Sequence, residues 1–270
     1  MRCIFCRRDS TSSRSREHIV PESLGNTSLV LPKGVVCDNC NNYFSREVEK
    51  PFLDSDAIRV LRFHQGLESK KGRVPSLTGL ITPGVPVIVT RFPRRNYTAV
   101  DVPTEALELV TRSESGSLIL PTGGPAPDVQ VVSRFMAKVA LEAMAARVVG
   151  HSGGQDYLCD EHQLDHLRNH ARHGRVARWP VHTRRIYAAN AKTSLPDGQP
   201  EQVLHESDFL ATSWGEWFFV LAIFGLEFAI NLGEPEIEGY ERWLRENNEA
   251  SPLYRADKLG LYPKPTSDQE

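Results

Sequence analysis

Two Cys-x2-Cys pairs near the N-terminus constrain this chain more than any other feature. Cys3 and Cys6 form the first pair and Cys37 and Cys40 the second, with 30 residues between the pairs. Each tight turn lets two thiolates reach one ion, and two such turns supply the four ligands of a tetrahedral zinc site. Because four thiolates leave no open coordination position, the spacing predicts a structural Zn²⁺ ion. The fifth cysteine, Cys159, has no such neighbour, and we expect a simple buried residue there.

The composition is that of an ordinary globular protein and excludes several other classes. Of 270 residues, 40% are hydrophobic and 24% are charged, which excludes collagen-like, coiled-coil and wholly disordered chains. No window approaches the roughly 18 to 20 uninterrupted apolar residues of a membrane helix, and the N-terminus lacks the apolar segment of a signal peptide. An odd number of cysteines does not suit a secreted disulfide framework. We therefore expect a cytoplasmic protein without a membrane partner.

Charge is distributed unevenly along the chain. Residues 51–100 contain 8 Lys and Arg against 3 Asp and Glu, whereas residues 201–270 contain 5 against 14. A basic N-terminal part is expected of a chain that meets a polyanion there, although solvated surfaces also produce such asymmetry by chance. The pattern favours nucleic acid as the partner of the N-terminal part. The acidic C-terminal region could contact a partner protein or form an oligomer.

Hydrophobic periodicity and turn residues predict an α+β fold in three segments. The first, residues 1–52, is a zinc-stapled module with helical spacing over 39–50. The second, residues 53–127, begins with a short helix capped by Asp54 or Ser55 and ended by Gly66. Its remainder is rich in Pro, Gly and β-branched residues and predicts antiparallel strands. These strands are expected over 85–91, 97–102, 107–111 and 118–120.

The third segment, residues 128–270, is predicted to be an α+β region that senses, positions or assembles. Asp128 is the expected cap of its strongest helix, whose apolar residues recur at helical spacing from 132 to 144. Further helices are expected over 160–173 and 240–247, and the tail over 264–270 is expected to fray. Strands are expected over 184–189, 202–206, 217–224 and 227–232, the last two as a hairpin around Phe224–Gly225.

A second motif lies between the cysteine pairs and directly after them. Residues 17–21 read Glu-His-Ile-Val-Pro, and Asn41 and Asn42 follow the second pair. Here the sequence resembles the HNH endonucleases, also called ββα-metal or His-Me finger nucleases. Their pattern is an acidic residue, a histidine, two apolar residues and a proline, followed downstream by CxxC and Asn or His. The resemblance covers roughly residues 1–50. It implies an N-terminal ββα-metal domain that hydrolyses phosphodiester bonds in nucleic acid, with double-stranded DNA the favoured substrate.

The motif residues also have sensible chemical roles. Phosphodiester hydrolysis needs a base and a metal ion. His18 titrates near neutral pH and can accept the proton of water, while Glu17 and Asn41 offer oxygen ligands to Mg²⁺ or Mn²⁺. By resemblance, His18 aligns with the general base of the family, Glu17 with its first metal-binding acid and Asn41 with its closing ligand. In a strand Glu17 and His18 project to opposite faces, so both serve one site only if the chain bends there.

Two residues depart from the pattern of the family. Glu17 stands where Asp is commoner, and Pro32 stands where the family usually has its middle Asn, nine residues before the closing ligand. The loop must therefore be braced by some other residue. Further candidates for metal ligands near Asn41 are Asn42, Glu47 and Glu49.

Six basic residues surround the proposed catalytic loop in sequence and suit phosphate contacts, which position a duplex without reading its bases. They are Arg7, Arg8, Arg14, Arg16, Arg46 and Lys50. The leading interpretation is thus a metal-dependent nuclease, with bacterial restriction or antiphage defence as one setting for it. The alternative is a non-catalytic zinc-ribbon nucleic-acid-binding or scaffold protein that keeps residues 17–21 for folding alone. A weaker alternative is an effector whose C-terminal region binds a small signalling molecule.

Overall fold

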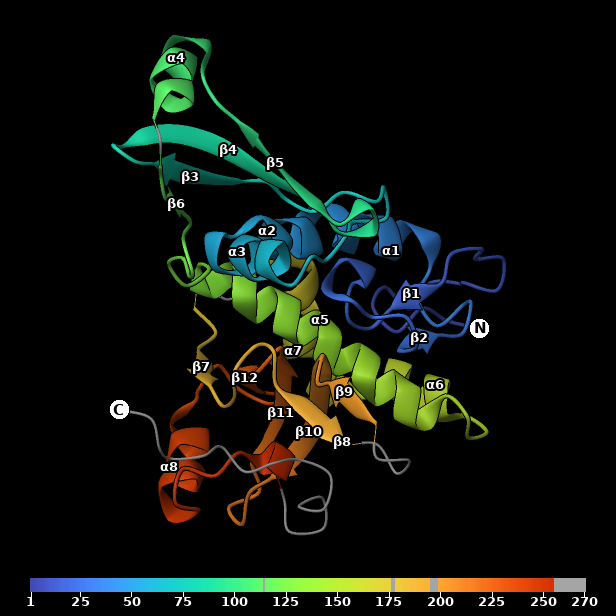
Figure 1. The fold of residues 1–270 in the computed structure, drawn as a ribbon. Helices are drawn as coiled ribbons and strands as arrows, with labels where there is room; N and C mark the ends of the chain where they lie inside the picture. The colour runs from blue at the N-terminus through green and yellow to red at the C-terminus, as the bar shows by residue number, and fades with distance from the viewer. Residues whose placement is uncertain (114, 176–177, 195–198, 255–270) are drawn as a thin grey trace. The chain divides into compact units, whose positions relative to one another are not determined.

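The computed structural model describes residues 1–113, 115–175, 178–194 and 199–254 (Figure 1). The chain divides into two compact units. Unit 1 comprises Met1–Pro21, Asn26–Pro51 and the chain from Asp128 onward, and unit 2 comprises Glu22–Gly25 and Phe52–Pro127. The chain therefore begins in unit 1 and returns to it at Asp128. Helices and sheets are both present, which confirms the α+β class. The tail expected to fray, 264–270, lies outside the described residues.

The N-terminal part of unit 1 has the order strand, strand, helix. Strand β1 (Glu17–His18) pairs antiparallel with β2 (Val30–Leu31), which puts Glu17 opposite Leu31 and His18 opposite Val30. Helix α1 (Asp38–Phe44) continues through a π-helical turn, η2 (Ser45–Glu49), into α2 (Lys50–Asp54). The helix expected over 39–50 is therefore present, with a π-helical second half.

Helix α5 (Val129–Val148) is the central helix of unit 1. The Asp128 carboxylate accepts hydrogen bonds from the backbone N–H groups of Gln130 and Val131, at 2.8 and 3.3 Å, which confirms the expected cap. Its residues Phe135, Met136 and Val139 are fully buried. In Figure 1, α5 lies between the β1–β2 hairpin and the large sheet of unit 1, and it contacts both. One helix thus joins the N-terminal module to the C-terminal core.

The helix expected over 160–173 is present only from Asp165 onward, because the chain breaks before that residue. Helix α6 (Gly154–Asp160) is followed by a 3₁₀ turn, η4 (His162–Leu164), and then by α7 (Asp165–His173). Glu161 has an extended backbone, and its carboxylate accepts a hydrogen bond from the N–H of Gln163 at 2.9 Å. This side chain ends one helix and caps the next turn.

Four antiparallel strands form the sheet of unit 1, in the order β10–β11–β12–β7. They are β7 (Val181–Arg185), β10 (His205–Ala211), β11 (Trp217–Ile223) and β12 (Leu226–Asn231). The expected hairpin is confirmed, and Phe224 and Gly225 turn it with positive φ. The strands expected over 184–189 and 202–206 are displaced by about three residues, since pairing with β12 and β11 sets their register.

Smaller elements complete unit 1. Helix α8 (Glu238–Glu246) confirms the expected terminal helix and packs Tyr240 and Leu244 against Phe218 and Val220 of the sheet, with the half-buried Trp243 beside them. A short hairpin pairs β8 (Lys192–Ser194) with β9 (Pro200–Gln202), and a 3₁₀ turn, η5, covers Pro252–Tyr254. None of the described helices has the length and apolar character needed to cross a bilayer.

Unit 2 holds a helix packed on a second antiparallel sheet, in the order β5–β4–β3–β6. Helix α3 (Asp56–His64) begins after Ser55, and Gly66, with a φ of 66°, follows its end, as expected. The remaining elements are η1 (Glu22–Leu24), β3 (Leu77–Ile81), β4 (Val85–Phe92), η3 (Pro93–Arg95), β5 (Tyr97–Asp101), α4 (Thr104–Arg112) and β6 (Leu118–Ile119).

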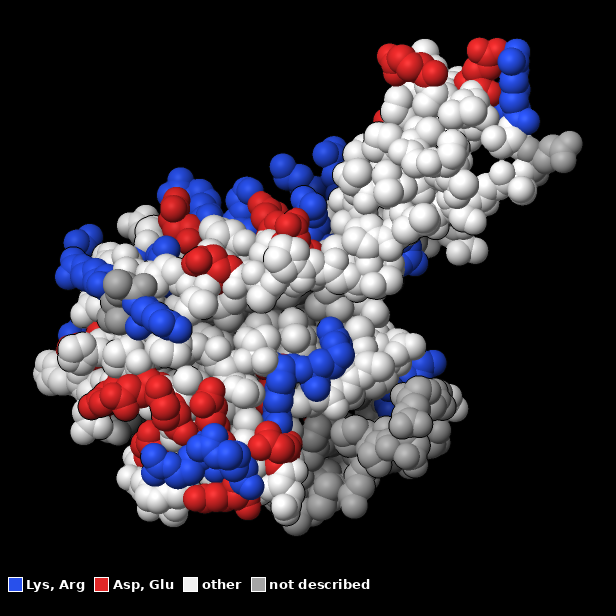
Figure 2. Space-filling view, turned by 90° about the vertical axis from the view of Figure 1, so that its left-hand side faces the viewer, with Lys and Arg blue, Asp and Glu red and all other residues white. Residues whose placement is uncertain are grey.

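The strand expected over 107–111 is wrong, because Thr104–Arg112 forms helix α4. Its sequence, TEALELVTR, holds Ala, Leu and Glu, which favour helix, and its only β-branched residues are Thr104, Val110 and Thr111. Both Leu107 and Leu109 are half exposed. The upper part of Figure 2, which is this sheet with α4, is largely uncharged apart from the region near α4, in keeping with the exposed Leu80, Ile88 and Ile119.

Candidate functional site

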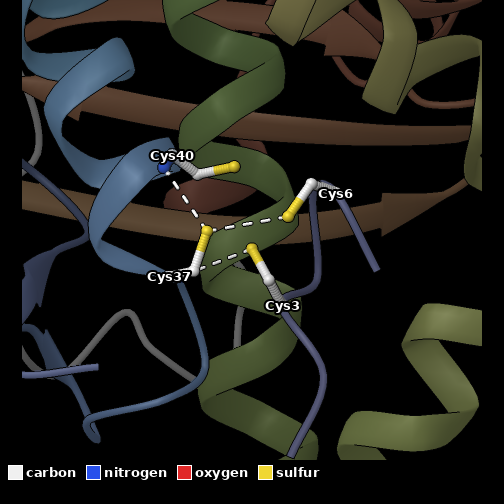
Figure 3. Close-up of side chains that lie close together, drawn as sticks. All are labelled: Cys3, Cys6, Cys37 and Cys40. Carbon is white, nitrogen blue, oxygen red and sulfur yellow. Dashed lines mark hydrogen bonds between the residues drawn. The ribbon is translucent and has the colours of Figure 1, made fainter. Parts of the chain in front are cut away.

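The four N-terminal cysteines converge on one point in unit 1. Figure 3 shows their sulfur atoms turned toward one another, two from the turn at Cys3–Cys6 and two from the start of α1. All four Sγ atoms lie within 4.8 Å of one another, and those of Cys6 and Cys37 are 3.6 Å apart. Zinc–sulfur bonds of about 2.3 Å in a tetrahedron separate the sulfurs by roughly 3.8 Å. The dimensions of the cluster therefore suit zinc.

Backbone groups hold these sulfurs in place. Cys37 caps α1, and its Sγ accepts a hydrogen bond from the N–H of Cys40 at 3.4 Å. The N–H of Cys37 in turn donates to the Sγ of Cys3 at 3.3 Å. Arg7 takes a left-handed backbone, φ 60°, that closes the first turn. Donors directed at sulfur favour the thiolate form, which is the form that binds metal.

Hydrogen bonds and burial shift the pKa values of three of these thiols. A hydrogen bond from Cys40 lowers the pKa of Cys3 to about 5. Burial raises the pKa of Cys37 to about 11, and the hydrogen bond to Cys3, together with burial, raises the pKa of Cys40 far above its ordinary value. A divalent cation is what would let all four ionise, so the donor set fits a structural metal. Cys159 is fully buried and lies outside the cluster, as expected.

Glu17 faces the interior of unit 1, while His18 is half-buried. The Glu17 side chain is only 6% exposed, and its Oε1 lies 2.7 Å from the Nζ of Lys138 on α5. The same Nζ donates to the backbone carbonyl of His18 at 3.1 Å. Glu49 and Glu142 complete the cluster, with carboxylate oxygens 2.7 and 2.8 Å from Nζ. The sequence offered no sign of this lysine, because it lies 120 residues from His18 within an apolar helix.

Lys138 is fully buried and remains charged. Burial alone would lower its pKa, but attraction to Glu142, Glu17 and Glu49 outweighs burial and raises the pKa of Lys138 well above its ordinary value. Burial also raises the pKa of Glu142, which pairs with Lys138 one helical turn along α5. The cluster is therefore one ammonium group shared by three carboxyl groups.

Helix α1 contacts the chain just before β1. The Asn41 side-chain amide donates to the carbonyl of Arg16 at 3.2 Å. The Asp38 carboxylate accepts from the N–H groups of Arg14 and Ser15, at 3.1 and 2.9 Å, and from the hydroxyl of Ser15. These hydrogen bonds, the one from Ser15 foremost, lower the pKa of Asp38. The start of α1 is thus fastened to the segment that leads into Glu17 and His18.

Other candidates near α1 differ in their surroundings. Asn42 and Glu47 are exposed, whereas Glu49 points to Lys138. Sequence reasoning missed Asp38, although its place between the two ligands Cys37 and Cys40 was visible.

Asn26 braces the loop in which Pro32 replaces the usual middle Asn of the family. Its side chain is 2% exposed. The amide donates to the carbonyls of Val20 and Leu29, at 2.6 and 3.0 Å, and its oxygen accepts from the N–H groups of Ser28 and Leu29, at 3.1 and 2.8 Å. Four hydrogen bonds from one side chain hold the end of β1 near the start of β2. Asn26 follows Gly25 in a polar stretch, which was the only sequence signal for it.

The proposed phosphate-contacting residues are mostly at the surface. Arg7 is an exception, since it forms an ion pair with Asp165, which also binds Arg168. The other five are exposed: Arg8, Arg14, Arg16, Arg46 and Lys50. His170 of α7 is not at the surface. It is a core residue that hydrogen-bonds Ser133 at 2.9 Å.

Comparison with known proteins places this site in a family. Residues 3–56 match the family model described as HNH endonuclease. The matched segment contains all four clustered cysteines together with Glu17, His18 and Asn41. Searches of curated proteins and of solved structures each returned no match. The N-terminal part of the chain is therefore an HNH endonuclease domain with a cysteine cluster that could bind a metal ion.

Proposed function

We propose that this chain is a metal-dependent HNH endonuclease that hydrolyses phosphodiester bonds in nucleic acid, with double-stranded DNA as its substrate. The observation that carries the proposal is the contact of α1 with the chain at β1. Through it the Asn41 amide lies against the carbonyl of Arg16, directly before Glu17 and His18. All three residues that the resemblance names, Glu17, His18 and Asn41, also lie within the segment that matches the family.

His18 is assigned as the general base. The residue is half-buried with its Nδ1 inside the protein, and its backbone carbonyl is fixed by Lys138 at 3.1 Å. An imidazole is the side chain best suited to accept the proton of an attacking water. Glu17 and Asn41 are assigned as ligands of Mg²⁺ or Mn²⁺. The bound ion would supply stabilisation of the charge that develops on the scissile phosphate.

The cysteine cluster is assigned a structural role, with Zn²⁺ as its ion. Cys37 caps α1 and Cys40 lies in its first turn, and the same helix carries Asn41. Asp38, between them, binds the backbone before β1. An ion held by all four cysteines would therefore keep α1 and β1 in register, and it would have no open position for substrate.

Five exposed basic side chains are assigned to the phosphates of the substrate, as sequence-independent contacts. They are Arg8, Arg14, Arg16, Arg46 and Lys50. Arg7 is expected to contribute less, because Asp165 already pairs with it. The acidic C-terminal region is assigned to a partner protein or to oligomer formation, and restriction or antiphage defence is the setting we favour.

Cleavage of supercoiled plasmid tests this function. Wild type and His18→Ala are compared with Mg²⁺, with Mn²⁺ and with EDTA, after zinc content and thermal melting have been matched. We expect metal-dependent nicking by wild type and a loss of about 100-fold or more in the variant. Activity that survives unchanged in His18→Ala would overturn the assignment of the base.

The Glu17–Lys138 ion pair favours one second candidate. This pair gives Glu17 a structural role without any divalent ion, as expected of a non-catalytic zinc-ribbon nucleic-acid-binding or scaffold protein. Such a protein would bind DNA or RNA equally well with EDTA or Mg²⁺ and would cleave neither. Absence of cleavage on double- and single-stranded DNA and on RNA, under every metal tested, would favour it.

A further inference from the structure

We propose that Lys138 is a positioning residue of the nuclease centre, supplied by α5 from outside the family-matched segment. This inference rests on the proposed nuclease function. Residues 3–56 match the family, whereas Lys138 lies far beyond them and reaches back within unit 1. The matched segment then needs a cation from the rest of the chain to hold its catalytic strand.

The contacts of Lys138 converge on β1. Its Nζ reaches the Oε1 of Glu17 at 2.7 Å and the carbonyl of His18 at 3.1 Å. These acceptors belong to consecutive residues, one through its side chain and the other through its backbone. A single ammonium group thus sets both the direction of the Glu17 carboxylate and the backbone from which the His18 imidazole projects. Hydrogen-bond partners of this kind orient metal-binding carboxylates in other proteins.

The same ammonium group also fixes the helix that follows the cysteine cluster. Glu49, on η2, is 15% exposed and lies 2.7 Å from Nζ. Because η2 continues directly from α1, the Lys138–Glu49 pair ties the helix of Asn41 to α5, as the Lys138–Glu17 pair ties β1. Lys138 therefore contacts β1, which carries Glu17 and His18, and the continuation of the helix that carries Asn41.

Glu142 provides a matched control. It pairs with Lys138 at 2.8 Å and both side chains are fully buried, but it lies on the same helix, four residues along. It holds the lysine from the same helix, and its link to Glu17 of β1 is charge repulsion rather than an ion pair. Glu142→Gln removes a charge from the same buried cluster while Lys138 keeps Glu17, Glu49 and the carbonyl of His18.

The experiment compares full-length wild type, Lys138→Met, Lys138→Arg and Glu142→Gln, each with matched zinc content. Plasmid cleavage is measured at saturating Mn²⁺. At that concentration, a change in metal affinity alone does not alter the rate. A second readout needs no activity. The dipeptide His18–Ile19 is the only His–Ile pair in the chain, so labelling His carbonyl carbon and Ile nitrogen gives one NMR signal that reports the hydrogen bond to the His18 carbonyl.

We expect Lys138→Met to move this signal and to lower the cleavage rate roughly 10- to 100-fold. Lys138→Arg should recover part of the rate, because it keeps a charged donor. Glu142→Gln should leave the signal in place and keep the rate within about 3-fold of wild type, since it lies outside the contacts to β1. If Lys138→Met does not fold, the double variant Lys138→Met/Glu142→Gln removes cation and anion together and is read in the same way.

Two outcomes would overturn the inference. One is a cleavage rate in Lys138→Met that stays near wild type. The other is a loss of cleavage rate in both Lys138→Met and Glu142→Gln that is proportional to the loss of thermal stability of each variant. That result would mean that the lysine has only a structural role. If wild type cleaves nothing, the nuclease proposal fails, and the NMR signal alone then decides whether Lys138 positions β1. An unmoved signal would reject that as well.

Discussion

Replacing Lys138 with methionine should destabilise unit 1 in a way that depends on pH. The substitution leaves Glu17, Glu49 and Glu142 in the interior, none more than 15% exposed, without their shared cation. Removing one partner of a buried ion pair costs about 3–5 kcal/mol, since the remaining charge stays unpaired. Glu142→Gln should cost far less, because Lys138 keeps Glu17, Glu49 and the carbonyl of His18 as partners.

The sign of the pH effect follows from the carboxylates. In Lys138→Met they relieve their burial by taking up protons, so their pKa values in the folded state rise above the unfolded value of about 4.3. Stability from such groups is complete below the unfolded pKa and is lost as pH rises through the folded pKa. Each carboxylate that is neutral in the folded variant then costs about 1.4 kcal/mol per pH unit, or roughly 2.7 kcal/mol between pH 6 and pH 8.

Urea unfolding measures this effect in unit 1 alone. All four tryptophans, Trp179, Trp214, Trp217 and Trp243, lie in unit 1, so their fluorescence follows its transition. At each pH, the free energy of unfolding of wild type is subtracted from that of the variant. The contributions of the other titrating groups then cancel. A difference that stays constant from pH 6 to pH 8 would refute the reasoning. It would mean that the carboxylates find other partners or water.

Four further predictions concern the cluster, the core and the loop. Cys40→Ser should lose the zinc that Cys159→Ser keeps, as measured by elemental analysis per chain, because Cys40 and not Cys159 belongs to the four-sulfur group. Burial lowers the pKa of His170 to about 4, so stability should be present above pH 6.5 and be lost as pH falls toward 4, by about 2 kcal/mol between pH 7 and pH 5; a wild-type slope no steeper than that of His170→Gln would contradict this. Asp128→Ala should lower the stability of unit 1 by about 1 kcal/mol through the lost cap of α5, measured by urea unfolding, whereas Asp128→Asn should lose little. Asn26→Ala should cost about 1–3 kcal/mol for each buried backbone group left without its partner and should lower plasmid cleavage, and an unaltered melting temperature would show that the loop is braced elsewhere.

The short-range features of this protein could be read from its sequence. The four clustered cysteines are two pairs, each spaced over four residues, and the fold brings all four sulfurs together. Helix α5 begins after the expected cap, and the β11–β12 hairpin turns at the expected Phe224–Gly225. In each case the decisive interaction joins residues a few positions apart, so residue type and spacing are enough to predict it. The match to the HNH family lies in the same short-range signal, over residues 3–56.

Prediction from the sequence failed where the spatial surroundings of a segment decide whether it forms a helix or a strand, or where a strand ends. The segment 104–112 alternates enough to suggest a strand, but its helix-favouring residues lie outside the sheet ladder and form α4. The strands β7 and β10 took their ends from the partners with which they pair, as with Arg184 opposite Glu227. A register is a property of two segments together, and one segment alone does not contain it.

Only the tertiary structure decided what surrounds the candidate catalytic residues. Lys138 lies 120 residues from His18 in the chain, yet α5 packs against the β1–β2 hairpin and brings its ammonium group to Glu17, Glu49 and the His18 carbonyl. In sequence Lys138 is one charge in an apolar helix, and nothing local distinguishes it from a surface lysine. The sequence determined which groups could perform the chemistry. Packing over long chain separations determined their partners, because burial forces every charge in the interior to find an opposite one.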